Sequence, residues 1–300
     1  MKRIIMTTIT IVLIPFFVIK TFTKTDNINI KYISSKIIKV KNEETGEIKE
    51  IPFEKYIVGV VSGEMPASYE LEALKAQAVA ARSYALYHMN GKEYDVTNTT
   101  SSQVYLDKTD LKEKWKEDYE KNIKKIEKAI METSGEYLTY KGETVDAMFF
   151  AVSTGKTENS EEVFVSKLPY LRSVSSSWDE KSPVFTDTVV MTLNDFYKNL
   201  NLPYEENIKI EILEKTSTGR IRKLKINENE IKGRDLQTKL KLRSNHFEII
   251  KKENNIIINT KGYGHGVGMS QFGANEMAKE GSDYKNILKH YYEGTEITKL

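Results

Sequence analysis

Residues Val60 to Leu86 read VVSGEMPASYELEALKAQAVAARSYAL, in which one acidic residue, Glu64, lies just before a proline and a long alanine-rich run. Ser68 is a suitable N-cap, and Asn90 and Gly91 form a stop signal. The stretch therefore predicts a helix from about Tyr69 to Met89, whose many alanines allow close packing.

The composition is that of a folded protein. With 39% hydrophobic and 29% charged residues, a chain of 300 residues has ordinary globular usage. Its 45 basic and 43 acidic residues are too balanced for a nucleic-acid binder, so we expect no nucleic acid partner. One basic cluster alternates with apolar residues, which favours a strand with a solvated face; it comprises Arg220, Arg222, Lys223 and Lys225.

The chain contains no cysteine. This excludes disulfides, thiolate zinc sites and cysteine nucleophiles. The histidines show no paired ligand spacing; they are His88, His246, His265 and His290. The sequence therefore gives no support to a metal site.

The N-terminus carries an apolar run, IIMTTITIVLIPFFVI, from Ile4 to Ile19 after two basic residues. It is short for a bilayer core of about 30 Å, so it suits either a signal-peptide core or a short anchor. No small-x-small cleavage site follows, which favours an uncleaved anchor. We therefore expect a membrane segment over residues 1–22, a polar linker over 23–31 and one catalytic domain over 32–300.

The elements expected along that domain mix helices with strands, which indicates an α+β fold of helices and antiparallel strands around an elongated substrate cleft. Besides the alanine-rich helix, the sequence predicts two strands around a turn at Thr45 and Gly46, a short helix over 52–61 and a further helix from Leu111 to Ile130, whose apolar residues, Trp115 among them, are expected in the core. A hairpin with strands over 136–140 and 144–153 turns at Lys141 and Gly142. Further strands are expected over 207–213, 221–226, 247–251 and 256–259, and helices over 194–200, 234–240 and 270–292.

The stretch STGKT from Ser153 to Thr157 has two possible interpretations as a catalytic motif. A phosphate-binding loop would need a glycine where Phe150 stands, so that interpretation fails. Ser153 and Lys156 match the S-x-x-K nucleophile motif of acyl enzymes, but the chain has neither Ser-Asp-Asn nor Lys-Thr-Gly. An acyl hydrolase is therefore a weak alternative.

The stretch GYGHGVGMSQFG places glycines at every second position from Gly262 to Gly268, around His265. Alternating glycines remove the side chains from one face, so that a backbone or a ligand can approach closely. Taken alone, the stretch fits a structural crossing as well as a binding site. Glu64 alone is equally open, because an acidic residue ahead of a helix also favours the helix dipole.

Three separated stretches together carry a family resemblance. SGEMPASYELEALKAQAVAARSYAL, STGKTENSEEVF and GYGHGVGMSQFGANEMA resemble the signature segments of the SpoIID family of sporulation proteins, in the same order. The resemblance extends from about Lys31 to the C-terminus. It implies a membrane-anchored lytic transglycosylase that cuts peptidoglycan glycan strands, with Glu64 as the catalytic acid.

This chemistry needs only one carboxyl group. The acid protonates the glycosidic oxygen and then takes a proton from the C6 hydroxyl of the muramic acid as that oxygen closes on C1, which gives a 1,6-anhydro ring. To act near neutral pH, Glu64 must hold its proton, and burial beside Met65 and Pro66 would raise its pKa. The N-terminus of the helix that follows is expected to oppose this by favouring the anion.

The resemblance also implies a set of polar residues around the cleft that bind sugar hydroxyls and N-acetyl groups. Arg82 and Glu158 could instead form a structural ion pair that holds two segments together. The full set is Gln77, Arg82, Tyr84, Gln103, Tyr105, Ser153, Thr157, Glu158, Asn159, His265 and Gln271.

The family further implies partners and a location. The partners are glycan strands, an amidase-type hydrolase that strips stem peptides, and membrane proteins of the engulfment complex. The location is the cell membrane, held through the N-terminus, with the domain in the septal space between two membranes. Some relatives carry Cys and His-Cys before Gln-Val-Tyr, whereas this loop reads DVTNTTSSQVY, so we expect no metal and no cofactor. The main alternative is a non-catalytic scaffold that grips glycan and recruits other wall hydrolases.

Overall fold

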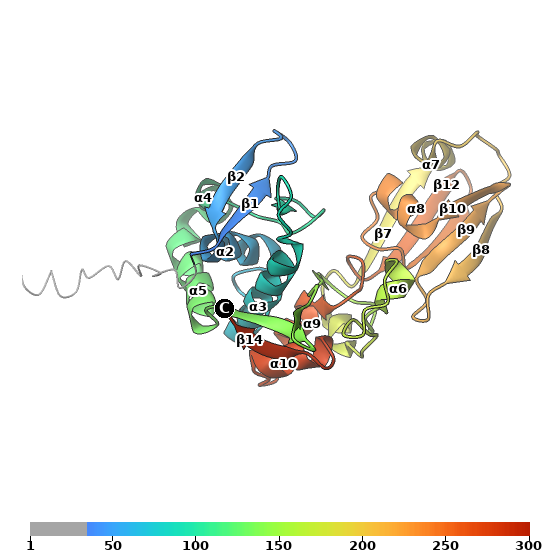
Figure 1. Ribbon diagram of the computed structural model, residues 1–300. Helices are drawn as coiled ribbons and strands as arrows, with labels where there is room; N and C mark the ends of the chain where they lie inside the picture. The colour runs from blue at the N-terminus through green and yellow to red at the C-terminus, as the bar shows by residue number, and fades with distance from the viewer. Residues whose placement is uncertain (1–34) are drawn as a thin grey trace, which may run out of the picture. The chain divides into compact units, whose positions relative to one another are not determined.

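Two helices, α2 (Phe53–Glu64) and α3 (Leu71–His88), form the centre of the helical region in the computed structural model, which describes residues 35–300 (Figure 1). The alanine-rich helix expected at 69–89 is confirmed as α3. Its alanines, among them Ala76, Ala80 and Ala81, are fully buried. Their small side chains let α2, α5 (Tyr119–Glu132) and α9 (Gln271–Lys279) pack against it.

Two predicted long helices are each divided in two. The helix expected at 111–130 is α4 (Lys108–Trp115) and α5, separated by a short 3-10 helix and by Lys116, whose φ of 47° lies outside helical values. The helix expected at 270–292 is α9 and α10 (Tyr284–Tyr291), interrupted at Gly281 with φ 95°. Apolar spacing continues across both breaks, so spacing alone predicted one helix in each case.

Small sheets accompany the helices. The expected hairpin at Thr45 and Gly46 is formed by β1 (Ile37–Lys41) and β2 (Ile48–Pro52), with β3 (Val96–Thr97) parallel to β1. The hairpin at Lys141 is shorter than expected: β4 (Glu136–Tyr140) pairs with β5 (Glu143–Thr144) and with β14 (Glu296–Lys299). Beyond it, β6 (Phe149–Phe150) leaves the hairpin and pairs in parallel with β13 (Met269–Ser270).

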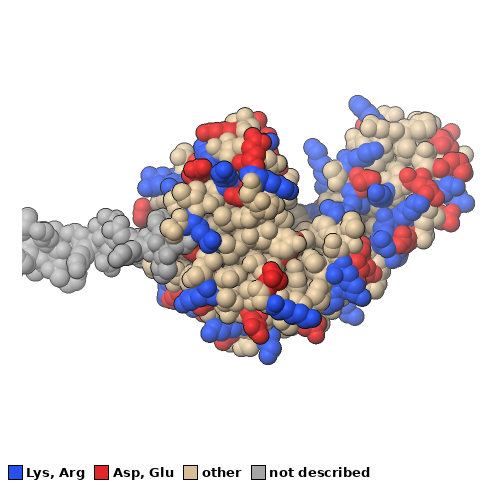
Figure 2. Space-filling model, viewed as in Figure 1, with Lys and Arg blue, Asp and Glu red and all other residues tan. Residues whose placement is uncertain are grey.

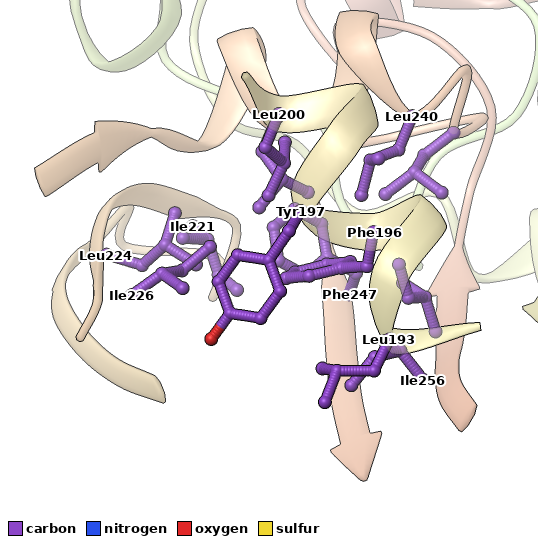
Figure 3. Close-up of a cluster of buried hydrophobic side chains, with 13 residues drawn as sticks. Leu193, Phe196, Tyr197, Leu200, Ile221, Leu224, Ile226, Leu240, Phe247 and Ile256 are labelled. Carbon is purple, nitrogen blue, oxygen red and sulfur yellow. The ribbon is translucent and has the colours of Figure 1, made fainter. Parts of the chain in front are cut away.

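Residues 186–261 form a β-rich region with two antiparallel sheets of three strands. One has the order β11-β12-β7 and the other β10-β9-β8. The strands are β7 (Thr186–Thr192), β8 (Ile210–Lys215), β9 (Ile221–Ile226), β10 (Asn229–Lys232), β11 (Phe247–Lys252) and β12 (Asn255–Lys261). Side chains from α7 (Leu193–Leu200), α8 (Gly233–Lys239) and both sheets form a shared apolar core (Figure 3).

The surface mixes charges of both signs. Lys and Arg are interspersed with Asp and Glu over the visible face (Figure 2). Three members of the predicted basic cluster form ion pairs with glutamates on or beside β8 to β10, which fits the predicted solvated face. They are Arg222, Lys223 and Lys225. Arg220 departs from the prediction, because its side chain is 0% exposed.

The predicted membrane segment from Ile4 to Ile19, and the domain boundaries at residues 22 and 31, lie outside the described residues. Within residues 35–300, no helix has the length and apolar character needed to cross a bilayer. The expected location at the cell membrane is therefore corrected, because the part of the chain that the structure describes contains no helix that could span a membrane.

Candidate functional site

Glu64 is the last residue of α2, which is longer than expected from the sequence. The chain then becomes extended at Met65, and α3 begins only at Leu71. The carboxyl group therefore lies at the C-terminal end of a helix, where the partial negative charge disfavours an anion. The prediction that a following helix N-terminus would favour the anion is wrong.

Uncharged amides hold the Glu64 carboxyl group. The backbone N–H of Val104 donates to Oε1 at 2.6 Å, and Nε2 of Gln271 donates to Oε2 at 3.3 Å. Burial raises the pKa of Glu64, and these hydrogen bonds oppose the rise, as does the charge of Lys114. The net direction favours the protonated form, as a general acid requires.

A hollow of about 870 Å³ opens beside Glu64. Residues 63–68 form one wall, and α4, the 3-10 helix and α5 form the other. The second wall contributes Lys114, Trp115, Asp118, Lys121, Asn122 and Lys125. Glu64 is half-buried there, so a ligand in the hollow would reach a carboxyl group that its own packing has largely desolvated.

The loop that carries Val104 lies directly against α2. A Cβ on Gly59 would stand 2.4 Å from the ring of Tyr105, and one on Gly63 would stand 2.4 Å from the carbonyl oxygen of Val104. No side chain fits at either position. Two glycines one helical turn apart therefore let the loop come close enough for the Val104 amide to reach the acid.

Gln77 and Gln271 are the implied cleft residues that lie with Glu64. Nε2 of Gln271 also donates to Oε1 of Gln77, at 3.4 Å. Gln77 is 0% exposed, and its Nε2 has no hydrogen-bond partner among the described residues. Gln77 does not line the hollow, so its role is to position Gln271, the donor to Glu64.

Gln103 and Tyr105 support the loop rather than face the hollow. Gln103 is buried, accepts from the hydroxyl of Tyr56 at 2.9 Å and donates to the carbonyl of Ala81 at 3.4 Å. The ring of Tyr105 stacks on Tyr56 with centroids 5.4 Å apart. Both residues therefore act on Glu64 indirectly, by fixing the path of Val104.

Tyr84 and His265 line a second, smaller pocket of about 260 Å³ together with Phe164 and Arg234. Burial raises the pKa of Tyr84 to about 12, so it remains a neutral phenol. Burial, together with the nearby guanidinium of Arg220, lowers the pKa of His265 to about 4. His265 is therefore neutral at physiological pH.

The hydrogen bonds of His265 fix its tautomer. Its Nδ1 accepts from the backbone N–H of Val267 at 3.1 Å, so the proton is on Nε2, which donates to the carbonyl of Phe149 at 3.0 Å. The imidazole thus joins the glycine-rich segment to β6 and uses both nitrogens within the protein.

The polar loop uses its side chains internally. Backbone N–H groups donate to Ser153 from Gly155 at 3.1 Å, to Thr157 from Val174 at 2.9 Å and to Asn159 from Ser173 at 3.0 Å. Ser153 is 0% exposed whereas Lys156 is exposed. The acyl-hydrolase alternative is therefore not supported, because the serine is sealed from solvent.

The ion pair considered between Arg82 and Glu158 is wrong. Arg82 donates instead to Glu54, at 2.8 Å from both Nε and Nη2, and also to Thr133 and the carbonyl of Ile130. It joins α2, α3 and α5, and its side chain is 0% exposed. No periodicity in the sequence marks Glu54 as its partner.

Glu158 pairs with Arg220 of the β-rich region. Nε of Arg220 lies 3.3 Å from Oε1 of Glu158, and both side chains are 0% exposed. The hydroxyl of Thr218 also donates to this carboxylate. Glu158 is therefore a structural residue that ties the polar loop to the β-rich region.

Sequence reasoning missed several residues of the site. The Val104 amide carries no side-chain signal, and Trp115 was assigned only to a helix core, although its half-buried side chain lines the hollow. Lys114, one residue before Trp115, also lines the hollow. The signal that the sequence offered for this wall was the pair Lys121 and Lys125, which lie four residues apart and so on one face of a helix. Residues 35–300 contain no group of three His, Asp or Glu side chains that could hold a metal, and independence from metal remains a prediction.

Comparison with known proteins adds to this geometry. Residues 41–140 match the family model described as SpoIID, stage II sporulation protein. Stage II sporulation protein D of Bacillus amyloliquefaciens and that of Bacillus subtilis are 41% and 42% identical over 259 residues, which covers 84% of this chain and 75% and 76% of theirs. The amidase enhancer of Bacillus subtilis is 30% identical over 295 residues, 80% of this chain and 40% of its own length.

Proposed function

Because the chain belongs to the SpoIID family of stage II sporulation proteins, we propose that it is a lytic transglycosylase that cleaves the glycan strands of peptidoglycan. The observation that carries the proposal is Glu64, a carboxyl group whose pKa is raised by burial and which borders a hollow of about 870 Å³. A carboxyl group with a raised pKa suits a reaction in which one group both gives and takes a proton.

In the first step, Glu64 protonates the oxygen of the glycosidic bond, and the bond from that oxygen to C1 of the muramic acid breaks. The resulting carboxylate is stabilised by the Val104 amide and by Gln271, which already donate to its two oxygens. Lys114 adds a favourable charge at this stage. The interactions that oppose the raised pKa in the resting state therefore stabilise the state after proton transfer.

In the second step, the C6 hydroxyl of the same sugar attacks C1, and its proton returns to Glu64. The product is a 1,6-anhydro ring, no water enters the reaction, and the acid is restored for the next cycle. Buried Gln77 accepts from Nε2 of Gln271 and so helps to hold the donor to Glu64 in place. The elongated substrate cleft is thus proposed to centre on Glu64, Gln77 and Gln271.

We also propose a place in a reaction order, as part of septal wall degradation during sporulation engulfment. Stem peptides occupy space beside the glycan, and strands from which an amidase has removed them are the better substrates. The likeness to an amidase enhancer supports a partner of the amidase type. Membrane proteins of the engulfment complex are the further proposed partners.

The test is mass spectrometry of the products formed from intact and from amidase-treated peptidoglycan. The expected result is muramic acid with 1,6-anhydro ends, formed at a higher initial rate on the amidase-treated strands. Reducing ends alone would make the enzyme a hydrolase, and equal rates would remove the reaction order. Binding without any cleavage would favour a non-catalytic scaffold.

A further inference from the structure

The hollow beside Glu64 is lined by three lysines, Lys114, Lys121 and Lys125. Apart from Glu64, its one acidic lining residue is Asp118. With Glu64 protonated, three positive charges therefore face one negative charge, although the whole chain is nearly neutral at +2. This local excess of positive charge favours an anionic ligand.

None of the three lysines forms an ion pair with a carboxylate within residues 35–300. Among the described residues, the ammonium of Lys114 donates to the carbonyl of Ser62 at 2.9 Å and that of Lys125 donates to the carbonyl of Tyr69. A carbonyl oxygen holds an ammonium group in place without neutralising it. Burial lowers the pKa of Lys125; the nearby charge of Glu70 opposes this effect, and the neighbouring charge of Lys121 adds to it. A bound anion would relieve that repulsion.

The proposed substrate carries a suitable anion. Each muramic acid bears a lactyl group, which is joined to the stem peptide through an amide in intact strands. Hydrolysis of that amide by an amidase leaves a lactyl carboxylate. An intact strand therefore offers a neutral amide at the position where a denuded strand offers a negative charge.

We propose that Lys121 and Lys125 bind the lactyl carboxylates of denuded glycan strands, and that they are the residues that distinguish denuded from intact strands. This inference rests on the proposed function for the identity of the substrate. Both lysines lie on one face of α5, one helical turn apart, so two ammonium groups can meet one carboxylate. Lys114 lies on α4 beside Trp115, and its charge instead favours the carboxylate form of Glu64.

The test measures binding of three glycan preparations to Glu64→Gln protein, so that no strand is cut. The preparations are denuded strands, the same strands with their carboxylates converted to methylamides, and intact strands. Replacing both lysines, Lys121→Gln with Lys125→Gln, should weaken binding of denuded strands about tenfold, since each exposed ion pair contributes up to about fivefold. Binding of the methylamide strands should be unchanged.

The matched control is Lys124→Gln with Lys128→Gln, which removes the same charge from α5 but at positions that do not line the hollow. This variant should bind denuded strands as the parent protein does. Salt should weaken binding of the parent more than that of the Lys121 and Lys125 variant.

Equal binding by all variants would overturn the proposal, as would an equal loss on methylamide strands. Failure of the proposed function has a different signature: the protein with Glu64 would form no 1,6-anhydro ends, while binding remained dependent on the lysines and the carboxylate.

Discussion

Glu64 and Glu158 are two carboxyl groups in different regions of the molecule, and burial raises the pKa of both. Glu158 is 0% exposed and faces a guanidinium, that of Arg220. Glu64 is half-buried, receives hydrogen bonds from two neutral amides and borders a hollow. The difference between them is the partner: one carboxyl group is closed off by an arginine, and the other is left facing a space for a ligand.

The comparison separates a structural role from a catalytic one. A buried ion pair strongly resists removal of one partner, because the remaining charge is left without compensation. A carboxyl group that is desolvated without an arginine stays ready to exchange a proton. A raised pKa alone would have marked both residues, so the surroundings decide which of them is the acid.

The largest expected effect is on activity, from Glu64→Gln. The amide keeps the shape of the side chain but cannot donate and recover the proton, so the rate of glycan cleavage should fall about 10²- to 10⁴-fold. The melting temperature should not fall. Cleavage assays and thermal unfolding of the same preparation measure both quantities, and a normal cleavage rate would remove Glu64 from the mechanism.

The next effect is on stability, from Arg220→Met. It leaves the Glu158 carboxyl group buried without its cation, so the free energy of unfolding should fall by about 3–5 kcal/mol. The control is Arg222→Gln, two residues away, where an exposed pair with Glu214 is lost and the cost should stay below about 1 kcal/mol. Denaturant unfolding measures both, and equal losses would contradict the assigned roles.

A smaller loss of stability is expected from Gly266→Ala. Gly266 has φ 88°, and a Cβ there would lie 2.8 Å from Nη2 of Arg220 and from Cγ of Glu158. The variant should lose about 2–4 kcal/mol, the sum of backbone strain and crowding of the ion pair. Gly142→Ala is the matched control, with φ 84° and open space around it, and should lose only about 1–2 kcal/mol. If the two variants lost the same amount, the contact with the ion pair would be unimportant.

The smallest expected effect is on the pH dependence of cleavage. A general acid is active while protonated, so activity should be lost as the pH rises through the raised pKa of Glu64. Gln271 donates to the carboxylate and lowers this pKa, so Gln271→Leu should move the alkaline limb to higher pH, by up to about one unit. Rates measured across a pH series test this, and a shift to lower pH would reverse the assigned role of Gln271.

The sequence predicted local structure better than contacts between distant segments. Helix α3 and strand β9 lie close to where apolar spacing and turn residues placed them, because both signals are local. The partner of Arg82 could not be predicted, since Glu54 lies on another helix and no pattern links the two. The partners of the polar loop were hidden in the same way. Its side chains were expected to line the cleft, whereas in the structure they accept hydrogen bonds from backbone N–H groups.

Within the candidate site, the resemblance located Glu64, Gln77 and Gln271, which the structure brings together. Two contributions could not be read from residue types. The amide of Val104 belongs to the backbone, so any residue but proline would supply it. The helix that ends at Glu64 was predicted to be shorter. The effect of the helix dipole on the pKa of the acid was therefore predicted with the wrong sign.

The pair Gly59 and Gly63 has a consequence for protein engineering. These glycines leave room for the loop because they have no side chain. The path of residues 103–106 therefore depends on two positions that contribute only backbone atoms. A library that diversifies position 104 can therefore change its side chain and still keep the backbone donor to Glu64. The same library should leave positions 59 and 63 unchanged, because any side chain there would push that donor away from the acid.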